Sequence, residues 1–154
     1  MNMSDAITIV NAAQHDIPEL VKLLNTLFTI EKDFQPDGER QARGLSMLIA
    51  QPEHGVIKVA RDSQNMIIGM VSAQLVISTA QGAASAWIED MVVSERSRGQ
   101  GVGKALLEAI VLWAKAKGAT RAQLLVDIEN ASALAYYAHL GWETTQLQAR
   151  RIFL

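Results

Sequence analysis

The chain has 154 residues, of which 49% are hydrophobic and 19% charged, a composition typical of a folded globular domain. Its 14 Lys and Arg and 16 Asp and Glu give a formal net charge of −2, without the basic excess that binding to duplex nucleic acid requires. The absence of cysteine excludes a disulfide scaffold, a thiolate metal site and a cysteine nucleophile. The sequence shows no signal-peptide pattern and no apolar run near the ~20 residues that span a bilayer. We therefore expect one cytoplasmic domain over residues 1–154, with no nucleic-acid or membrane partner.

The first part of the chain predicts helices followed by an antiparallel meander. β-Prone runs indicate strands, and apolar residues that recur every three or four positions indicate helices. The expected elements are a strand at 7–10, a helix within 11–28, a polar loop at 31–40, a helix at 41–50, and strands at 56–61, 66–78 and 86–93.

From Ser94 onward the pattern changes to alternating helices and strands. The expected elements are a helix at 101–117, a strand at 123–126, a helix at 131–140 and further β segments within 142–153. Because a strand, helix and strand in succession favour parallel pairing, the second part predicts parallel pairing at the centre of a mixed sheet.

The most informative stretch is the glycine-rich loop over residues 96–104, which leaves a strand and opens a helix. The first N–H groups of a helix lack internal partners and lie at its positive end, so they attract anions. Gly99, Gly101 and Gly103 allow backbone donors to approach such an anion. Arg98 and Lys104 add positive charge, and the loop therefore predicts a polyanionic ligand.

Two common phosphate-binding patterns do not match this loop. A P-loop needs glycine where Arg98 stands and Ser or Thr where Ala105 stands. A dinucleotide fingerprint needs its third glycine where Lys104 stands. The dinucleotide alternative stays open because Asp127 follows the next strand, where a ribose-binding acid would lie. A loop whose glycines merely turn the chain is the remaining alternative.

A third pattern fits every position. Arg98-x-x-Gly101-x-Gly103 resembles the coenzyme A signature of the GNAT superfamily of N-acetyltransferases. Residues 88–93 resemble the fourth strand of that family. A later motif is also similar, and its residues are Asn130, Ala133, Tyr137, Leu140, Gly141 and Trp142. The resemblance implies an α/β fold: a mostly antiparallel mixed sheet with helices on both faces, whose parallel central pair is split by the cofactor.

The resemblance also implies acetyl-CoA as co-substrate, and no metal is expected because the chain has no cysteine and its three histidines are scattered. The pantetheine arm would pair with strand residues, the pyrophosphate would lie on the glycine-rich loop, and Asn130 would bond the arm. Asn is also a good helix N-cap, so both roles stay open for Asn130. The implied cofactor-binding residues are Met91, Val92, Val93, Arg98, Gly99, Gln100, Gly101, Val102, Gly103, Lys104, Asn130, Ala133 and Tyr137.

Acetyl transfer to an amine needs a base for the ammonium and a proton donor for the departing thiolate. By resemblance, Tyr137 is the expected donor, with a role as a core aromatic as its alternative. Glu89 or Asp90 is the expected base, or either forms a structural salt bridge. Because adjacent strand residues point to opposite faces, only one of the two carboxylates is expected to face the acceptor.

The implied function is N-acetylation of a primary amine, on a small molecule, within a ternary complex. Acetylation of a protein N-terminus or lysine is the alternative enzyme, and a non-catalytic acyl-CoA sensor is the alternative binding module. A homodimer is expected by resemblance alone. The tryptophans Trp87, Trp113 and Trp142 are interpreted as packing residues, and the three histidines show no metal-ligand spacing.

Overall fold

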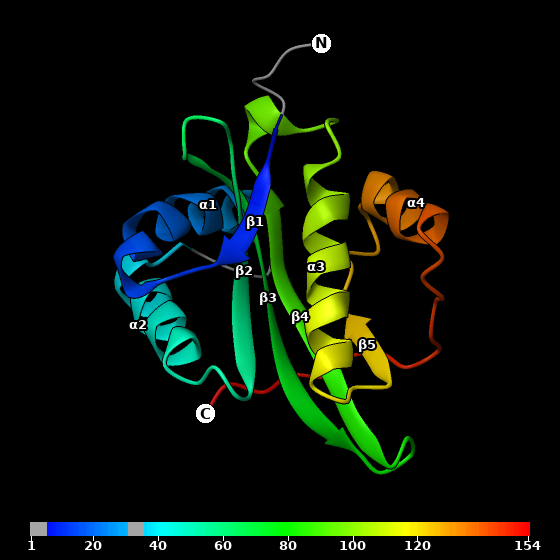
Figure 1. Cartoon of the computed structure of the whole chain (residues 1–154). Helices are drawn as coiled ribbons and strands as arrows, with labels where there is room; N and C mark the ends of the chain where they lie inside the picture. Colours follow the sequence, from blue (N-terminus) through cyan, green and yellow to red (C-terminus); the bar gives the residue numbers. More distant parts are fainter. Residues whose placement is uncertain (1–5, 31–35) are drawn as a thin grey trace. The chain divides into compact units, whose positions relative to one another are not determined.

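The computed structural model describes residues 6–30 and 36–154, and the chain divides into two compact units, Met1–Leu124 and Leu125–Leu154. Figure 1 shows the helices and strands coloured in chain order, from blue at the N-terminus to red at the C-terminus. In the first unit they are β1 (Thr8–Asn11), the short 3₁₀ helix η2 (Gln14–Asp16), α1 (Ile17–Ile30), α2 (Gly38–Ile49), β2 (Gly55–Arg61), β3 (Ile67–Ser78), β4 (Ala83–Val93), the 3₁₀ helix η3 (Glu95–Ser97), α3 (Val102–Ala116) and β5 (Arg121–Leu124).

The sheet of the first unit has the strand order β1-β2-β3-β4-β5. Its first three pairings are antiparallel, and β4 pairs with β5 in parallel after the α3 crossover. This confirms the expected mixed, mostly antiparallel sheet. The parallel pair ends the strand order, whereas the sequence pattern placed it at the centre with further strands beyond it.

Helices cover both faces of this sheet, as expected (Figure 1). On one face, the buried Met70 of β3 belongs to a core cluster with Leu20 and Leu24 of α1 and Leu45 of α2. The preceding residue, Gly69, points to the other face, because a Cβ there would lie 3.0 Å from the Cδ1 of Leu106 in α3. The close approach of α3 to the sheet therefore requires glycine at this position.

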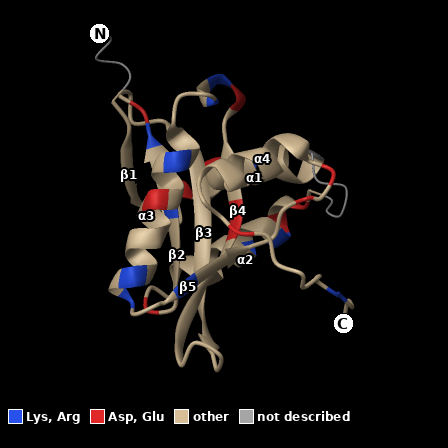
Figure 2. Ribbon diagram, turned by 90° about the vertical axis from the view of Figure 1, so that its right-hand side faces the viewer, with Lys and Arg blue, Asp and Glu red and all other residues tan. Residues whose placement is uncertain are grey.

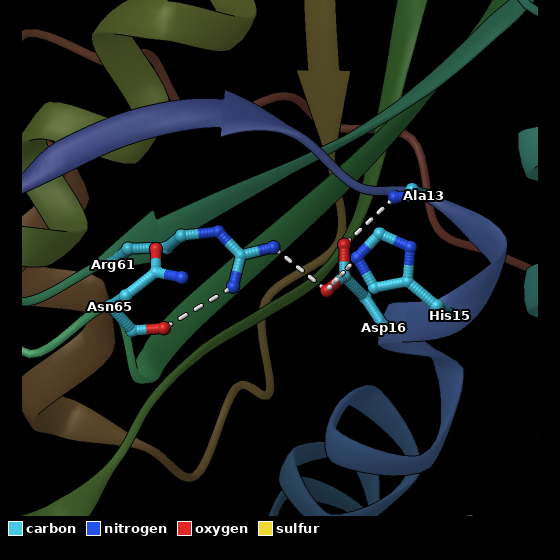
Figure 3. A network of polar contacts seen from close by, with 5 residues as sticks. All are labelled: Ala13, His15, Asp16, Arg61 and Asn65. Carbon is cyan, nitrogen blue, oxygen red and sulfur yellow. Dashed lines mark hydrogen bonds and ion pairs between the residues drawn. The ribbon is translucent and has the colours of Figure 1, made fainter.

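An ion pair between the buried Asp16 of η2 and the partly buried Arg61 joins the segment directly before α1 to β2 (Figure 3). The carboxylate of Asp16 bonds Arg61 through Oδ1 at 2.7 Å and accepts the N–H of Ala13 through Oδ2 at 2.8 Å. Burial by itself would raise the pKa of Asp16, but the hydrogen bonds from Ala13 and Arg61 outweigh it and hold that pKa below its usual value. His15 Nε2 lies 3.5 Å from the same carboxylate.

The helix α2 begins three residues earlier than its apolar spacing indicated. Asp37 caps it, since its side chain accepts the N–H of Arg40 at 3.1 Å. The polar loop expected at 31–40 is therefore helical from Gly38 onward, and residues 31–35 lie outside the described residues. The N-cap, which is a local signal at Asp37, overrides the weak apolar pattern of the first turn.

The second unit contains the helix α4 (Ala131–His139) and an exposed terminal segment. The β segments expected within 142–153 do not form, and no residue after Leu124 is in a strand. Residues 143–154 are exposed, and an extended segment without a paired neighbour has no ladder to stabilise it. The strand expected at 123–126 also differs, since β5 occupies Arg121–Leu124.

Candidate active site

The glycine-rich loop has the backbone geometry of an anion site. Gly99 and Gly101 have φ values of +76° and +81°, the left-handed region that favours glycine, and space is open around both. Among the described residues, no group accepts the backbone N–H of Gly99, Gln100 or Gly101. These donors precede α3, a 15-residue helix that has no side-chain cap at its start. The loop therefore fits a pyrophosphate at the positive end of a helix.

The two cations of the loop have different surroundings. Arg98 donates from Nε to the backbone O of Val93 at 3.2 Å, which ties the loop to the end of β4. Lys104 is exposed, and its Nζ lies 3.9 Å from the carboxylate of Glu108, a contact that contributes little at such a surface. Both cations belong to the segment that carries the unpaired N–H groups, and their charge favours an anion there.

A β-bulge opens the end of β4. Ser72 of β3 pairs with Glu89 and Met70 pairs with Val92, so Asp90 and Met91 together oppose a single residue. Asp90 has a φ of +55°, a left-handed conformation inside a strand. The parallel pairing of β4 with β5 ends at Ile88, so the last residues of β4 have no partner in β5. An edge that does not pair with β5 is suited to backbone pairing with an extended ligand.

A pocket of about 330 Å³ lies beside this bulge, between α1, α2, β3 and β4. The described lining residues include two carboxylates and no Lys or Arg, and Figure 2 shows the acidic residues (red) on β4. They are Leu24, Phe28, Gln41, Gly44, Leu45, Met47, Leu48, Gln51, Ser72, Gln74, Glu89 and Asp90. The expected strict alternation was wrong here, because Glu89 and Asp90 line the same pocket. The left-handed backbone at Asp90 interrupts the alternation of the strand.

Glu89 is held by two neighbours. The indole Nε1 of Trp87 donates to its Oε1 at 2.7 Å, and the Oγ of the buried Ser72 donates to its backbone O at 3.1 Å. Among the described residues, no Lys or Arg lies within ion-pair distance of the Glu89 carboxylate. The structural salt bridge that the sequence left open is therefore not made by Glu89 within the described chain.

Gln41 is a pocket residue that the sequence analysis missed. It is buried in α2, and its Oε1 and Nε2 have no hydrogen-bond partner among the described residues. Its spacing was the available signal, since Gln41, Leu45 and Leu48 are separated by four and three residues on one helix face. A polar side chain on the apolar face of a helix is a candidate for contact with a ligand.

The second unit holds the remaining expected site residues. The Oδ1 of Asn130 accepts the N–H of Ala133 at 3.0 Å, so Asn130 is the N-cap of α4. The ring of Tyr137 meets Tyr136 and Trp142 edge to face, with centroids 5.5 and 6.0 Å apart. Burial, with a smaller contribution from Tyr136, raises the pKa of Tyr137. The phenol of Tyr137 therefore keeps its proton throughout the neutral range.

Within the first unit, the structure brings together Glu89, Asp90, the end of β4 and the loop 98–104 that follows it. The first unit thus has a mixed sheet, a bulged strand β4 whose last residues do not pair with β5, and a glycine-rich loop that leads into α3. The chain belongs to the acetyltransferase (GNAT) family, whose family model matches residues 17–142. The resemblance noted from the motifs is confirmed.

Individual relatives agree with this family. Aminoglycoside N(6')-acetyltransferase type 1 of Klebsiella aerogenes is 29% identical over 124 residues, which cover 77% of this chain and 80% of that protein. N-acetyltransferase 8F1 of Rattus norvegicus is 30% identical over 92 residues, 60% of this chain, and the match spans only 41% of the rat protein. A crystallised aminoglycoside N-acetyltransferase in complex with CoA has a TM-score of 0.77 at 19% identity, with 97% of this chain and 93% of that chain covered.

Two features are absent from the described residues. No helix there is long and apolar enough to cross a membrane. No group of three or more His, Cys, Asp or Glu side chains in the described part of the chain is arranged to hold a metal ion.

Proposed function

We propose that this chain is an N-acetyltransferase that transfers an acetyl group from acetyl-CoA to a primary amine on a small molecule, in a ternary complex. The observation that carries the proposal is the acidic pocket that meets the bulge of β4, directly before the anion-binding loop. A cationic amine would enter this pocket because its described lining carries two carboxylates and no cation. A volume of about 330 Å³ suits a small acceptor or one end of a larger acceptor.

The residues of β4 and the loop would hold the cofactor. Acetyl-CoA would supply the activated acyl thioester. The N–H groups over residues 99–104, with the side chains of Arg98 and Lys104, would bind its pyrophosphate. The open edge at Met91, Val92 and Val93 would pair with the pantetheine arm. The Nδ2 of Asn130 is proposed to bond the same arm, since only its Oδ1 is used in capping α4.

Proton transfer would be divided between two side chains. Glu89 would take a proton from the ammonium of the acceptor, directly or through water, so that the nitrogen lone pair is free to attack. Asp90 would add negative charge to the same pocket or take the role of base itself. Tyr137 would donate a hydrogen bond to the departing sulfur, and its raised pKa keeps it protonated for that purpose. A backbone amide of Val92 or Val93 would stabilise the oxyanion.

A panel of amines with acetyl-CoA, followed by the release of free thiol, tests the activity. The chain has no cysteine, so the thiol reporter reads only the released CoA. We expect turnover with small cationic amines, because an aminoglycoside N-acetyltransferase is among the relatives of this chain. Turnover only with peptides that carry a free N-terminus or lysine would assign the protein-acetylating alternative. CoA binding without any turnover would assign the sensor alternative.

The contribution of Glu89 is tested by Glu89→Gln, which keeps the size of the side chain and removes its charge. We expect a loss of about 10²-fold or more in turnover near neutral pH, with partial recovery as rising pH deprotonates the amine without help. Asp90→Asn is the matched variant, because Asn also tolerates the left-handed backbone at that position. Wild-type turnover by Glu89→Gln at every pH would move the role of base to Asp90 or to solvent.

The dimer is proposed on the family resemblance alone. We propose a homodimer in the cytoplasm that consists of one domain per chain. Sedimentation equilibrium of the purified chain tests the dimer, and a monomer at micromolar concentration would contradict it.

A further inference from the structure

The Glu89 carboxylate has a partner that the proposed proton transfer does not use. The Nε1 of Trp87 lies 2.7 Å from the Oε1 of Glu89, a short distance that is typical of a hydrogen bond to a charged acceptor. The two residues stand two positions apart on β4, before the bulge, so their side chains emerge on the same face. Among the residues that the structure describes, this is the hydrogen bond that reaches the carboxylate.

The backbone beneath this carboxylate is also fixed. Ser72 is buried, and its Oγ donates to the backbone O of Glu89 at 3.1 Å. The pair formed by Ser72 and Glu89 is the last one before the β-bulge at Asp90. The remaining freedom of Glu89 is therefore rotation about its side-chain bonds, and the bond from Trp87 restricts that rotation.

We propose that Trp87 is a positioning residue that holds the Glu89 carboxylate in its reactive orientation, an inference that rests on the proposed function. An indole N–H is a donor only, so Trp87 occupies Oε1 and cannot itself take a proton. The Oε2 of Glu89 is then the oxygen that accepts the proton. The N–H bond of the ammonium breaks, an O–H bond forms on Oε2, and the nitrogen keeps the electron pair. A base that is oriented before the acceptor arrives needs no reorganisation during the reaction.

A packing role for Trp87 makes a different prediction from a positioning role. The ring is half-buried, and Trp87 pairs with Gln74 on β3 and with Gln123 on β5. Phe in place of Trp87 keeps an aromatic ring at this position and removes only the indole N–H and part of the volume. The matched control is Trp113→Phe in α3, which makes the same chemical change outside β4 and the pocket.

The test is a double-mutant cycle in single-turnover acetyl transfer from acetyl-CoA to the best amine of the panel. Trp87→Phe should lower the transfer rate about tenfold, while the KM of the amine stays within about twofold of the wild-type value. In the Glu89→Gln background, Trp87→Phe should cause no further loss, because the oriented charge is already absent. Trp113→Phe should transfer at the wild-type rate.

A measurement without turnover tests the hydrogen bond itself. The chain has three tryptophans, so three indole N–H resonances are expected, and each Trp→Phe variant assigns one. Glu89→Ala should move the resonance of Trp87 and speed its exchange with solvent, whereas Asp90→Asn should leave it in place.

Two results would overturn the positioning role. They are a wild-type transfer rate in Trp87→Phe, or an equal loss from Trp87→Phe with and without the Glu89 carboxylate.

Failure of the proposed function gives a different result. In that case the wild-type protein acetylates no amine although the Trp87 resonance still responds to Glu89→Ala, which would refute the acetyl transfer and the positioning role together.

Discussion

A carboxylate placed in the glycine-rich loop should weaken coenzyme A binding without unfolding the protein. Gly101 is the N-cap of α3, and its φ of +81° is a conformation that side chains rarely adopt. Gly101→Asp therefore costs about 1–2 kcal/mol of backbone strain. Nothing lies within 4 Å of the added Cβ, so no clash adds to this cost. A negative charge at the start of a helix stabilises the folded state by about 0.3–1 kcal/mol, so the net loss of stability is about 1 kcal/mol.

The effect of Gly101→Asp on binding is larger. A carboxylate about 4 Å from one phosphate charge is repelled by about 1 kcal/mol in bulk water and by about 4 kcal/mol at the effective dielectric constant of a protein surface. We therefore expect affinity for CoA to fall at least about fivefold, with the fall decreasing as salt is added. Isothermal titration calorimetry measures the affinity, and thermal unfolding shows that the variant is folded.

Gly118→Asp is the matched control for this variant. Gly118 follows the other end of α3, has a φ of +86° and is likewise surrounded by open space. Both variants carry the same strain and the same added charge, but only Gly101 belongs to the proposed phosphate site. Equal affinities of the two variants for CoA would refute the placement of the pyrophosphate on this loop. Binding of NAD in competition with CoA would instead support the dinucleotide alternative.

The remaining predictions concern a proton donor, an ion pair and a buried amide. Tyr137→Phe should lower the single-turnover transfer rate about 10²-fold or more at unchanged CoA affinity, and a larger loss from Tyr136→Phe would place the donor one residue earlier. Asp16→Asn should lower the free energy of unfolding at neutral pH by about 3 kcal/mol, because it leaves the guanidinium of Arg61 without its buried partner. The folded state lowers the pKa of Asp16, so the stability difference between wild type and Asp16→Asn should be complete above the unfolded-state pKa of about 3.9. It should disappear as pH falls through the folded-state pKa. A stability difference in urea titrations that does not depend on pH would contradict the ion pair as its source. Gln41→Met should raise the free energy of unfolding by about 1–2 kcal/mol, since it removes two buried polar atoms that have no partner in the described chain, and a loss of stability would show that the amide is satisfied in solution.

The backbone geometry of the glycine-rich loop could be predicted from local sequence, and its role as an anion site stays a prediction. Its glycines, its two cations and the helix that follows lie within a few residues of one another, and the N–H groups at the start of a helix are unpaired whatever surrounds them. The left-handed Gly99 and Gly101 agree with that interpretation. The later motif is local in the same way, and the cap of α4 at Asn130 follows from a side chain three residues from its partner.

The organisation of the acidic pocket depended on pairing between distant segments. Strand alternation separates neighbouring residues, and only the register of β4 against β3 places a bulge at Asp90 that brings its carboxylate and that of Glu89 to one pocket. The hydrogen bond from Trp87 to Glu89 has a local spacing of two residues. The side-chain rotamers decide whether the indole of Trp87 donates to Glu89 or only packs beside it, and these rotamers depend on the surrounding strands.

Amphipathic spacing and caps determine where a helix lies, because they act within one or two turns of the chain. The spacing of α3 and α4 accordingly predicted both helices to within one residue at each end. Strands obey no such local rule, since a strand exists only where another strand pairs with it. For this reason β5 begins and ends two residues earlier than its apolar run indicated, and residues 142–153 form no strand. Helical spacing places Gln41 on the same face of α2 as Leu45, but only the packing of α2 leaves its amide buried without a hydrogen bond in the described chain.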